Sequence, residues 1–306
     1  MRALKTCLAV LLLAPAARPG IVSEVRSATA QGDFALAKGR LEAYRKQHGV
    51  TPEMILAQSW LGRGALELKR LDQAAAYAAE TRKLALEQLK GRKLDAEKQL
   101  PLALGASIEV QARVLAARGS RAEAVSFLRR ELKAWWDTSI RTRIQKNLNL
   151  LTLEGKPAPP LDVARWLGPK PPALSALKGR PVLLFFWAHW CPDCKTQIPA
   201  LVKLEGAYAR RGLALIGPTQ HYGYVARGEE ASPEAELRYI EQIRQKFYAE
   251  LKDMPVPVSE ENFKRYGAST VPTLVLIDRQ GIVQLYHPDL MSYEALASKV
   301  ESVLAK

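Results

Sequence analysis

The sequence of 306 residues predicts two domains, an array of antiparallel helices followed by an α/β sandwich with a mixed sheet. Apolar residues recur at helical spacing from residue 21 to about residue 151. Prolines and a glycine interrupt this pattern between residues 154 and 160, and the chain is long enough for two hydrophobic cores. Short β-branched or aromatic runs then alternate with helical stretches. We therefore expect a helical domain over residues 17–153 and an α/β domain over residues 154–306.

The N-terminus has the pattern of a secretory signal peptide. Two basic residues precede the apolar run Leu8–Ala14, and Ala14-Pro15-Ala16 fits the small-x-small pattern of a cleavage site. We expect residues 1–16 to be removed and the mature protein to be exported to the periplasm or cell envelope. The alternative is an uncleaved N-terminal membrane anchor, which the shortness of the run disfavours. No other stretch approaches the roughly 20 apolar residues that a membrane span requires.

The positive charge of the chain is concentrated in its first half. The formal net charge is +14, of which residues 155–306, with 19 basic and 16 acidic side chains, contribute only +3. A basic helical region can meet nucleic acid, an anionic membrane surface or acidic proteins. The expected export argues against nucleic acid. An Arg-rich solvated surface without a specific partner is the alternative.

The helical region predicts five to seven amphipathic helices, with Gly or Pro mainly between them. Three short polar turns each precede a helix with a small residue near its start, at Ala37, Ala74 and Ala124. Each small residue would let the preceding helix pack closely. Their separations of 37 and 50 residues depart from the 34-residue tetratricopeptide period, so the array resembles a degenerate form of that repeat. Its role is either a docking surface for a protein partner or a scaffold that places the second domain.

The α/β domain is expected to begin with an apolar strand and to end with a hairpin and a helix. The expected strands are 182–187, 213–217, a short one near 256, 273–278 and 282–286. The expected helices are 191–211, 233–253 and 293–305.

Two cysteines in a Cys-x-x-Cys motif lie where the first of these strands meets a helix. If Cys7 is removed with the signal peptide, Cys191 and Cys194 are the only cysteines of the mature chain. Their spacing closes a very small ring, which suits redox exchange better than a structural crosslink. A helix N-terminus stabilises a thiolate, so we expect Cys191 to attack a substrate disulfide and the deeper Cys194 to resolve the mixed disulfide.

The motif and a second segment resemble the thioredoxin fold. The first is Phe-Trp-Ala-His-Trp-Cys-Pro-Asp-Cys-Lys at residues 186–195, and the second is Gly-Ala-Ser-Thr-Val-Pro-Thr at 267–273. The upstream Leu-Ser-Ala-Leu-Lys-Gly-Arg-Pro at 174–181, with the extra segment before Pro272, is more similar to the exported TlpA/ResA-like branch. The resemblance covers about residues 155–306.

This resemblance implies roles for the residues around the cysteines. Trp190, Pro192 and Asp193 would complete the active-site motif. Val271–Pro272 would be a cis peptide bond beside the sulfurs, and Thr270, Val271 and Pro272 would form a loop that pairs like a strand with a substrate polypeptide. An ordinary turn proline is the alternative.

One departure from many thioredoxins affects the mechanism. Phe185 stands in an apolar strand where a buried acid is common, so the proton acceptor for Cys194 must come from elsewhere. Asp193, His189 and His221 are candidates, and for each a solvated, non-catalytic role is an equal alternative. Asp193 would raise the pKa of Cys191 and make the pair reducing, whereas His189 would act oppositely. The loop 219–230, rich in aromatic residues and glycine, suits either a substrate groove or a simply packed loop.

Three other functions are weighed against disulfide exchange. Metal binding needs two further ligands beside the cysteines, and the proline in the motif favours redox chemistry, so we expect no metal and no cofactor. A peroxiredoxin would carry Thr-x-x-Cys, but residues 188–191 read Ala-His-Trp-Cys. The remaining alternative is an envelope adaptor that binds a partner through its helical repeats and uses the thioredoxin-like domain only as a scaffold.

The sequence therefore predicts an exported thiol-disulfide oxidoreductase that reduces protein disulfides through Cys191 and Cys194. The resemblance implies a membrane thiol reductant that returns electrons to the pair. It also implies substrates such as the cysteines of apocytochrome c or of other envelope proteins, without choosing between them.

Overall fold

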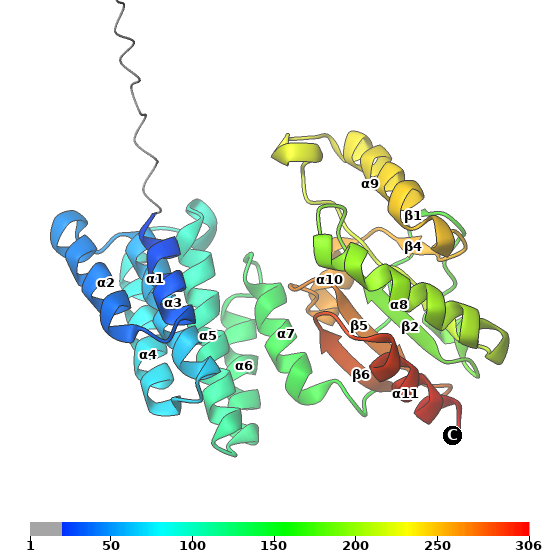
Figure 1. The fold of residues 1–306 in the computed structure, drawn as a ribbon, viewed down its shortest axis with the longest axis horizontal. Coiled ribbons are helices and arrows are strands. Elements are labelled where there is room, and N and C mark those ends of the chain that lie inside the picture. The colour runs from blue at the N-terminus through cyan, green and yellow to red at the C-terminus, as the bar shows by residue number, and fades with distance from the viewer. Residues whose placement is uncertain (1–19, 306) are drawn as a thin grey trace, which may run out of the picture.

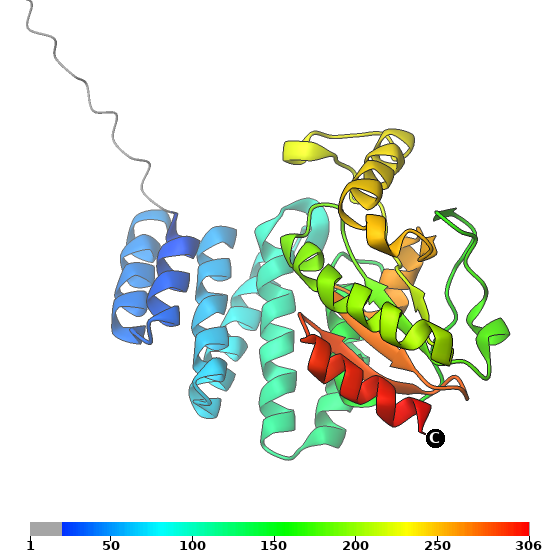
Figure 2. The ribbon, with the colours of Figure 1, turned by 45° about the vertical axis from the view of Figure 1, so that its right-hand side comes forward.

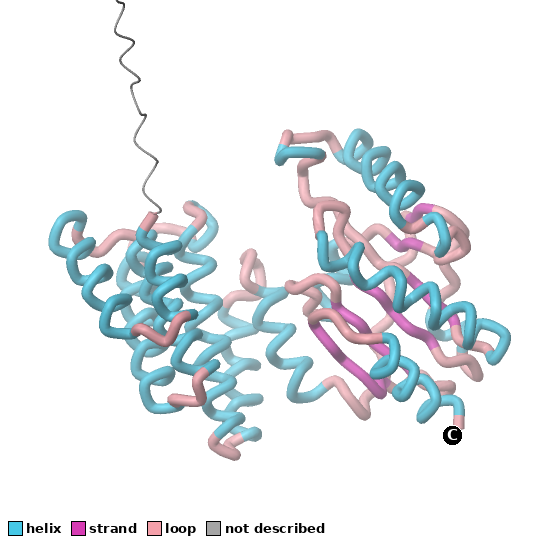
Figure 3. Tube along the Cα trace, viewed as in Figure 1, coloured by secondary structure: helices cyan, strands magenta, loops and turns pink. Residues whose placement is uncertain are grey.

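The computed structural model describes residues 20–305 (Figure 1). The expected signal peptide, residues 1–16, and with it Cys7 lie outside the described residues. The fold class is confirmed, because over the described residues the first half contains helices without strands and the strands lie in the second half (Figure 3).

Between residues 20 and 153, the helical domain contains seven α-helices and a short 3₁₀ turn at Leu94–Ala96. Neighbours in sequence pack against each other, and α1, α3, α5 and α7 also contact one another in turn. The helices are α1 (Ile21–Ala30), α2 (Phe34–His48), α3 (Pro52–Glu67), α4 (Leu71–Gln88), α5 (Gln99–Ala117), α6 (Arg121–Ala134) and α7 (Arg141–Thr152).

Small residues allow these helices to approach closely, as the sequence predicts. Ala37, Ala74 and Ala124 are each completely buried near the start of a helix. A Cβ atom on Gly62 would lie 3.5 Å from the backbone nitrogen of Ala78, so α3 and α4 pack with their backbones near van der Waals contact.

Helix α5 corrects one expectation. Within the described part of the chain, it is a helix long and apolar enough by length and composition to cross a membrane. Most of its apolar side chains, among them Leu100, Leu104 and Ile108, are buried, and the helix contacts α3, α4, α6 and α7. Its apolar character is therefore accounted for by its place at the centre of the helical domain.

The α/β domain contains a four-stranded mixed sheet in the order β3-β2-β5-β6. Strand β2 is parallel to β3 and antiparallel to β5, and β5 is antiparallel to β6. The short strands β1 and β4 form a separate antiparallel pair that the sequence did not predict. The strands are β1 (Trp166–Leu167), β2 (Val182–Phe186), β3 (Ala214–Ile216), β4 (Val256–Pro257), β5 (Thr273–Ile277) and β6 (Val283–Pro288).

Helices cover both faces of this sheet. Leu183 and Phe185 of β2 pack with residues of α8, α9 and α11, and Figure 2 shows α8 and α11 across the same face. Leu184 and Phe186 point to the other face, toward α10. The helices are α8 (Pro192–Tyr208), α9 (Pro233–Phe247), α10 (Glu260–Tyr266) and α11 (Tyr293–Leu304). Helix α9 is shorter than expected, because a 3₁₀ turn at Ala249–Leu251 follows the completely buried Tyr248.

The two domains are in close contact through α7 and α10. The Asn149 side-chain amide donates a hydrogen bond of 2.9 Å to the carbonyl of Tyr266. Gly267 has a φ of +63°, and a Cβ atom there would lie 2.3 Å from the backbone nitrogen of Lys146. The chain enters the second core at Leu153, directly after α7.

Candidate redox site

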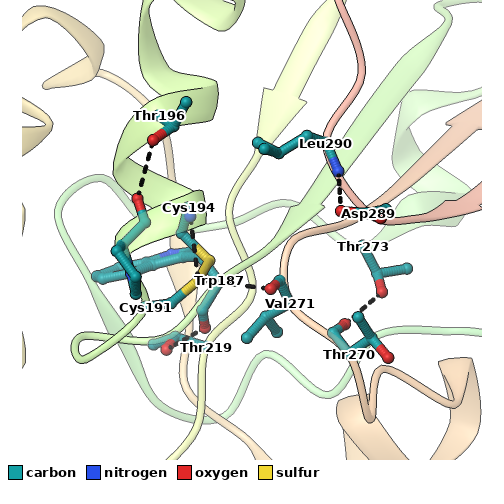
Figure 4. Close-up of a disulfide and its surroundings, with 11 residues drawn as sticks. Trp187, Cys191, Cys194, Thr196, Thr219, Thr270, Val271, Thr273, Asp289 and Leu290 are labelled. Atoms are coloured by element: carbon teal, nitrogen blue, oxygen red, sulfur yellow. Dashed lines mark hydrogen bonds between the residues drawn. A yellow bond between two sulfur atoms is a disulfide. The ribbon is translucent and has the colours of Figure 1, made fainter. Parts of the chain in front are cut away.

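Cys191 and Cys194 lie at the junction between β2 and α8. Cys191 is the N-cap of α8, and Pro192 follows it at the first helical position, where its missing N–H is not needed. The two cysteines form a disulfide (Figure 4). The N–H of Cys194 points at the Cys191 Sγ atom at 3.0 Å. Both residues are buried, with exposures of 2% for Cys191 and 0% for Cys194.

The proline loop reaches the disulfide from the start of β5. The Val271–Pro272 peptide bond is cis, which confirms that expectation. The carbonyl oxygen of Val271 lies 3.4 Å from the Cys191 Sγ atom, and Figure 4 shows the two side by side. The Thr273 hydroxyl donates a hydrogen bond of 2.6 Å to the Thr270 carbonyl, and the N–H of Asp289 donates one of 3.0 Å to the Pro272 carbonyl. These bonds fix the loop on both sides.

Two further contacts hold the end of β2 beneath the disulfide. Trp187 is completely buried, and its indole N–H donates a hydrogen bond of 2.9 Å to the Gly217 carbonyl. The Thr219 hydroxyl donates one of 2.9 Å to the Trp187 carbonyl (Figure 4). The loop after β3 is thereby joined to the segment that leads into the cysteines.

His189 and His221, both candidates for the proton acceptor, meet at one carboxylate. His189 is 1% exposed, and its Nε2 atom lies 3.2 Å from Oε1 of Glu236 on α9. The Nδ1 atom of His221 lies 3.4 Å from Oε2 of the same carboxylate. Asp193, the third candidate, is exposed in the first turn of α8.

Glu236 is the site residue that sequence reasoning missed. Its side chain is 1% exposed. The N–H groups of Tyr222 and Gly223 donate hydrogen bonds of 2.6 and 2.9 Å to its two oxygens. A signal did exist, because Glu236 shares the buried face of α9 with Ile240 and Ile243 at helical spacing. A carboxylate on an apolar stripe needs hydrogen-bond partners.

Tyrosines enclose His189. The ring centres of Tyr222, Tyr224 and Tyr239 lie 5.3 to 5.6 Å from the imidazole centre. Burial lowers the pKa of His189 below its usual range, and Glu236 offsets part of that shift. Burial therefore favours the neutral imidazole, and a carboxylate neighbour favours the tautomer with its proton on Nε2.

The loop 219–230 packs against the motif and also contributes to its surface. Tyr222 lies edge-on to Trp190, with ring centres 5.4 Å apart. Trp190 itself is 45% exposed and precedes Cys191 directly. On the opposite side, an open groove of about 450 Å³ runs between α8 and the segment 290–293. Gln197 fixes this segment with two hydrogen bonds of 2.9 Å to the backbone of Met291.

Phe185 is completely buried among apolar neighbours, so strand β2 supplies no acid to this site. The buried carboxylate beside the motif comes instead from α9, through Glu236. Within residues 20–305, no group of three or more His, Cys, Asp or Glu side chains is arranged to hold a metal ion.

Comparisons with known proteins agree with this geometry. Residues 155–286 match the AhpC/TSA family. The thioredoxin-like protein YneN of Bacillus subtilis (strain 168) is 28% identical over 48% of this chain and 79% of its own length. The thiol:disulfide interchange protein DsbE of Xylella fastidiosa (strain 9a5c) is 29% identical over 50% of this chain and 70% of its own length. The thiol-disulfide oxidoreductase ResA of Bacillus thuringiensis subsp. konkukian (strain 97-27) is 30% identical over 42% of this chain and 66% of its own length.

Proposed function

We propose that this chain is a thiol-disulfide oxidoreductase and that Cys191 and Cys194 are its redox pair. The match of residues 155–286 to the AhpC/TSA family supports the proposal. The observation that carries the proposal is the placement of their disulfide. It lies at the N-terminus of α8, with the Cys191 sulfur 3.4 Å from the backbone of the proline loop.

The preferred direction is reduction of a protein disulfide. In the reduced pair, the N–H of Cys194 and the N-terminus of α8 stabilise a thiolate on Cys191. This thiolate attacks one sulfur of the substrate disulfide. The substrate S–S bond breaks, a Cys191–substrate disulfide forms, and the leaving substrate sulfur takes up a proton. Cys194 then loses its proton and attacks Cys191, which releases the second substrate thiol and leaves the pair oxidised by two electrons.

The substrate polypeptide would lie along Thr270, Val271 and Pro272. The Val271 backbone beside Cys191 suits strand-like pairing, in which main-chain bonds give affinity and side-chain contacts give specificity. The exposed Trp190 ring borders the same position. His189 and His221, which meet at Glu236, remain the candidates for the proton acceptor of Cys194.

Export to the periplasm or cell envelope rests on the signal-like residues 1–16. After each reducing turnover the pair is a disulfide and needs two electrons. A membrane thiol reductant is the donor that the resemblance to TlpA/ResA-like proteins implies.

The helical domain would bind an acidic segment of a protein partner. Arg26 of α1 and Arg63 of α3 both lie over the Trp60 ring, 4.7 and 4.4 Å from its centre. Burial and the neighbouring Arg143 lower the pKa of Arg63 to about 10. Within residues 20–305, its buried Nε atom has no hydrogen-bond partner. Two like charges on one ring favour an anionic ligand.

The pure adaptor alternative is not favoured, since the relatives are named for disulfide exchange. The deciding experiment is a redox titration of the purified protein against glutathione and dithiothreitol buffers with thiol trapping. A reversible two-electron transition well below the glutathione potential, lost in Cys191→Ser, supports a reductase. A high potential would instead indicate an oxidase or isomerase. Absence of a reversible couple would refute exchange in favour of the adaptor.

A further inference from the structure

Burial of the Glu236 carboxylate costs free energy, and the packing of the fold does not by itself require a charged group at this position. A charged side chain withdrawn from water needs hydrogen bonds to both oxygens. Glu236 obtains them from the segment that flanks the redox motif. Oε1 contacts the Tyr222 N–H and the His189 Nε2, and Oε2 contacts the Gly223 N–H and lies near the His221 Nδ1.

We propose that Glu236 is a positioning residue for disulfide exchange, which acts on the Cys191 site through His189 and through Tyr222. The inference rests on the proposed function, because it assigns a role within that reaction. Glu236 touches neither sulfur among its hydrogen-bond contacts, so its effect is transmitted by the two residues that it holds.

The first route runs through Tyr222 to the surface that a substrate meets. Glu236 fixes the Tyr222 backbone by a hydrogen bond of 2.6 Å. The Tyr222 ring then lies edge-on to Trp190 at 5.4 Å, a geometry in which aromatic pairs attract. Trp190 is exposed and adjacent to Cys191 in sequence. Without the carboxylate, the loop would no longer hold Tyr222 against Trp190, and substrate binding would weaken.

The second route runs through the imidazole of His189. The carboxylate accepts a hydrogen bond from the Nε2–H, so it favours one tautomer and one ring orientation two residues before Cys191. It also favours a positive charge on the ring, against the effect of burial. The titratable groups that face His189 from the surrounding elements are Glu236, His221, Lys195, Tyr222, Tyr224 and Tyr239.

A carboxylate is chemically suited to this position in a way that an amide is not. Its two oxygens both accept, and donors approach each of them. A glutamine of the same size offers one accepting oxygen, and its NH₂ group would face either the His189 and Tyr222 donors or the Gly223 donor. Glu236→Gln should therefore retain the fold and impair the site, whereas Glu236→Ala removes all contacts.

The experiment compares Glu236→Gln and Glu236→Ala with Glu234→Gln in the full mature chain. Glu234 is exposed on the same helix, two residues earlier, and makes a matched control for charge. Reduction of insulin disulfides with dithiothreitol as electron donor gives kcat and KM. The rate of Cys191 alkylation as a function of pH reports the thiol directly, and circular dichroism verifies folding.

We expect KM to rise about tenfold in Glu236→Ala and severalfold in Glu236→Gln, which is the loss expected for binding contacts of this kind. We also expect the pH midpoint of Cys191 alkylation to shift in both Glu236 variants and to stay unchanged in Glu234→Gln. If Glu236→Ala does not fold, the results for Glu236→Gln test the inference. The inference would be overturned if the folded Glu236 variants kept KM, kcat and the alkylation profile within about twofold of wild type. The proposed function would stand in that case, because the wild type would still catalyse exchange. A wild type without a reversible couple would instead overturn the proposed function, and this inference with it.

Discussion

The side-chain amide of Asn149 donates a hydrogen bond of 2.9 Å to the main-chain carbonyl of Tyr266. This bond joins the last helix of the helical domain to the end of α10 in the α/β domain. Arg141 and Glu261 add an ion pair of 3.6 Å between the same two helices. The contact is therefore specific and involves the backbone of the α/β domain.

Gly267→Ala should destabilise this contact strongly. The added Cβ would overlap the Lys146 backbone, and the φ of +63° is unfavourable for alanine. We expect the free energy of unfolding to fall by about 3 kcal/mol, measured by urea denaturation. The matched control is Gly206→Ala in α8, where a Cβ meets no atom within 4 Å and helix propensity predicts a small gain. Equal behaviour of the two variants would contradict the predicted overlap.

The two cysteines should give different products when each is replaced. Cys194→Ser leaves the attacking sulfur but removes the resolving one, so a mixed disulfide with substrate should accumulate. Cys191→Ser should reduce exchange to the uncatalysed rate and trap nothing. Non-reducing electrophoresis and mass spectrometry after incubation with a disulfide substrate distinguish the two. Accumulation of the adduct in Cys191→Ser would reverse the assigned roles.

Protonation of His189 should destabilise the fold in acid. Its pKa is lowered in the folded protein, so below the ordinary histidine value of about 6.5 the unfolded chain binds more protons. Stability attributable to this residue is present above that pH and declines as the pH falls toward the lower folded pKa. Unfolding measured from pH 7.5 to 5 should show a weaker pH dependence in His189→Asn than in wild type. His48→Asn, on an exposed residue of α2, should retain the wild-type dependence.

Glu109 should be the most sensitive acid of the helical domain. Burial raises its pKa, but Arg143 at 2.8 Å and Lys146 at 3.3 Å outweigh this effect and lower it to about 2. Glu109→Gln leaves the two cations partly buried without their carboxylate and should cost about 3 kcal/mol at pH 7. The stabilisation in wild type should fade as the pH falls from about 4.5 toward 2. An exposed control, Glu42→Gln, should change stability by less than about 0.5 kcal/mol.

Binding of an acidic partner by the helical domain can be tested with a polyglutamate peptide. Arg26→Gln combined with Arg63→Gln should weaken binding about tenfold in calorimetry at low salt. Arg129→Gln combined with Arg130→Gln removes the same charge from the exposed face of α6 and should have a smaller effect. Equal losses would attribute binding to net charge alone.

Local patterns explain what the sequence could and could not predict. The position of Cys191 at a helix start follows from the apolar run before it and the proline after it, all within ten residues. Glu236 lies more than forty residues away in sequence, and its hydrogen bonds to the backbone of a loop depend on tertiary packing. Val271 could be placed beside Cys191 only through a family resemblance, because pairing of β2 with β5 spans some ninety residues. Strand β4 was expected near residue 256, but β1 and its pairing with β4 were missed because a two-residue strand carries no periodicity.

Only three residues separate Gly267, which abuts the backbone of α7, from Val271, whose carbonyl faces Cys191. A connection this short can extend very little, so the contact with α7 also restrains the position of the Val271 carbonyl beside the Cys191 sulfur. A chain that starts at residue 154 would leave the Tyr266 carbonyl and the Gly267 surface open to water. The two domains are thus distinct in sequence, but they are firmly connected in the structure. A ligand that moved α7 would therefore also displace the loop that we propose binds the substrate.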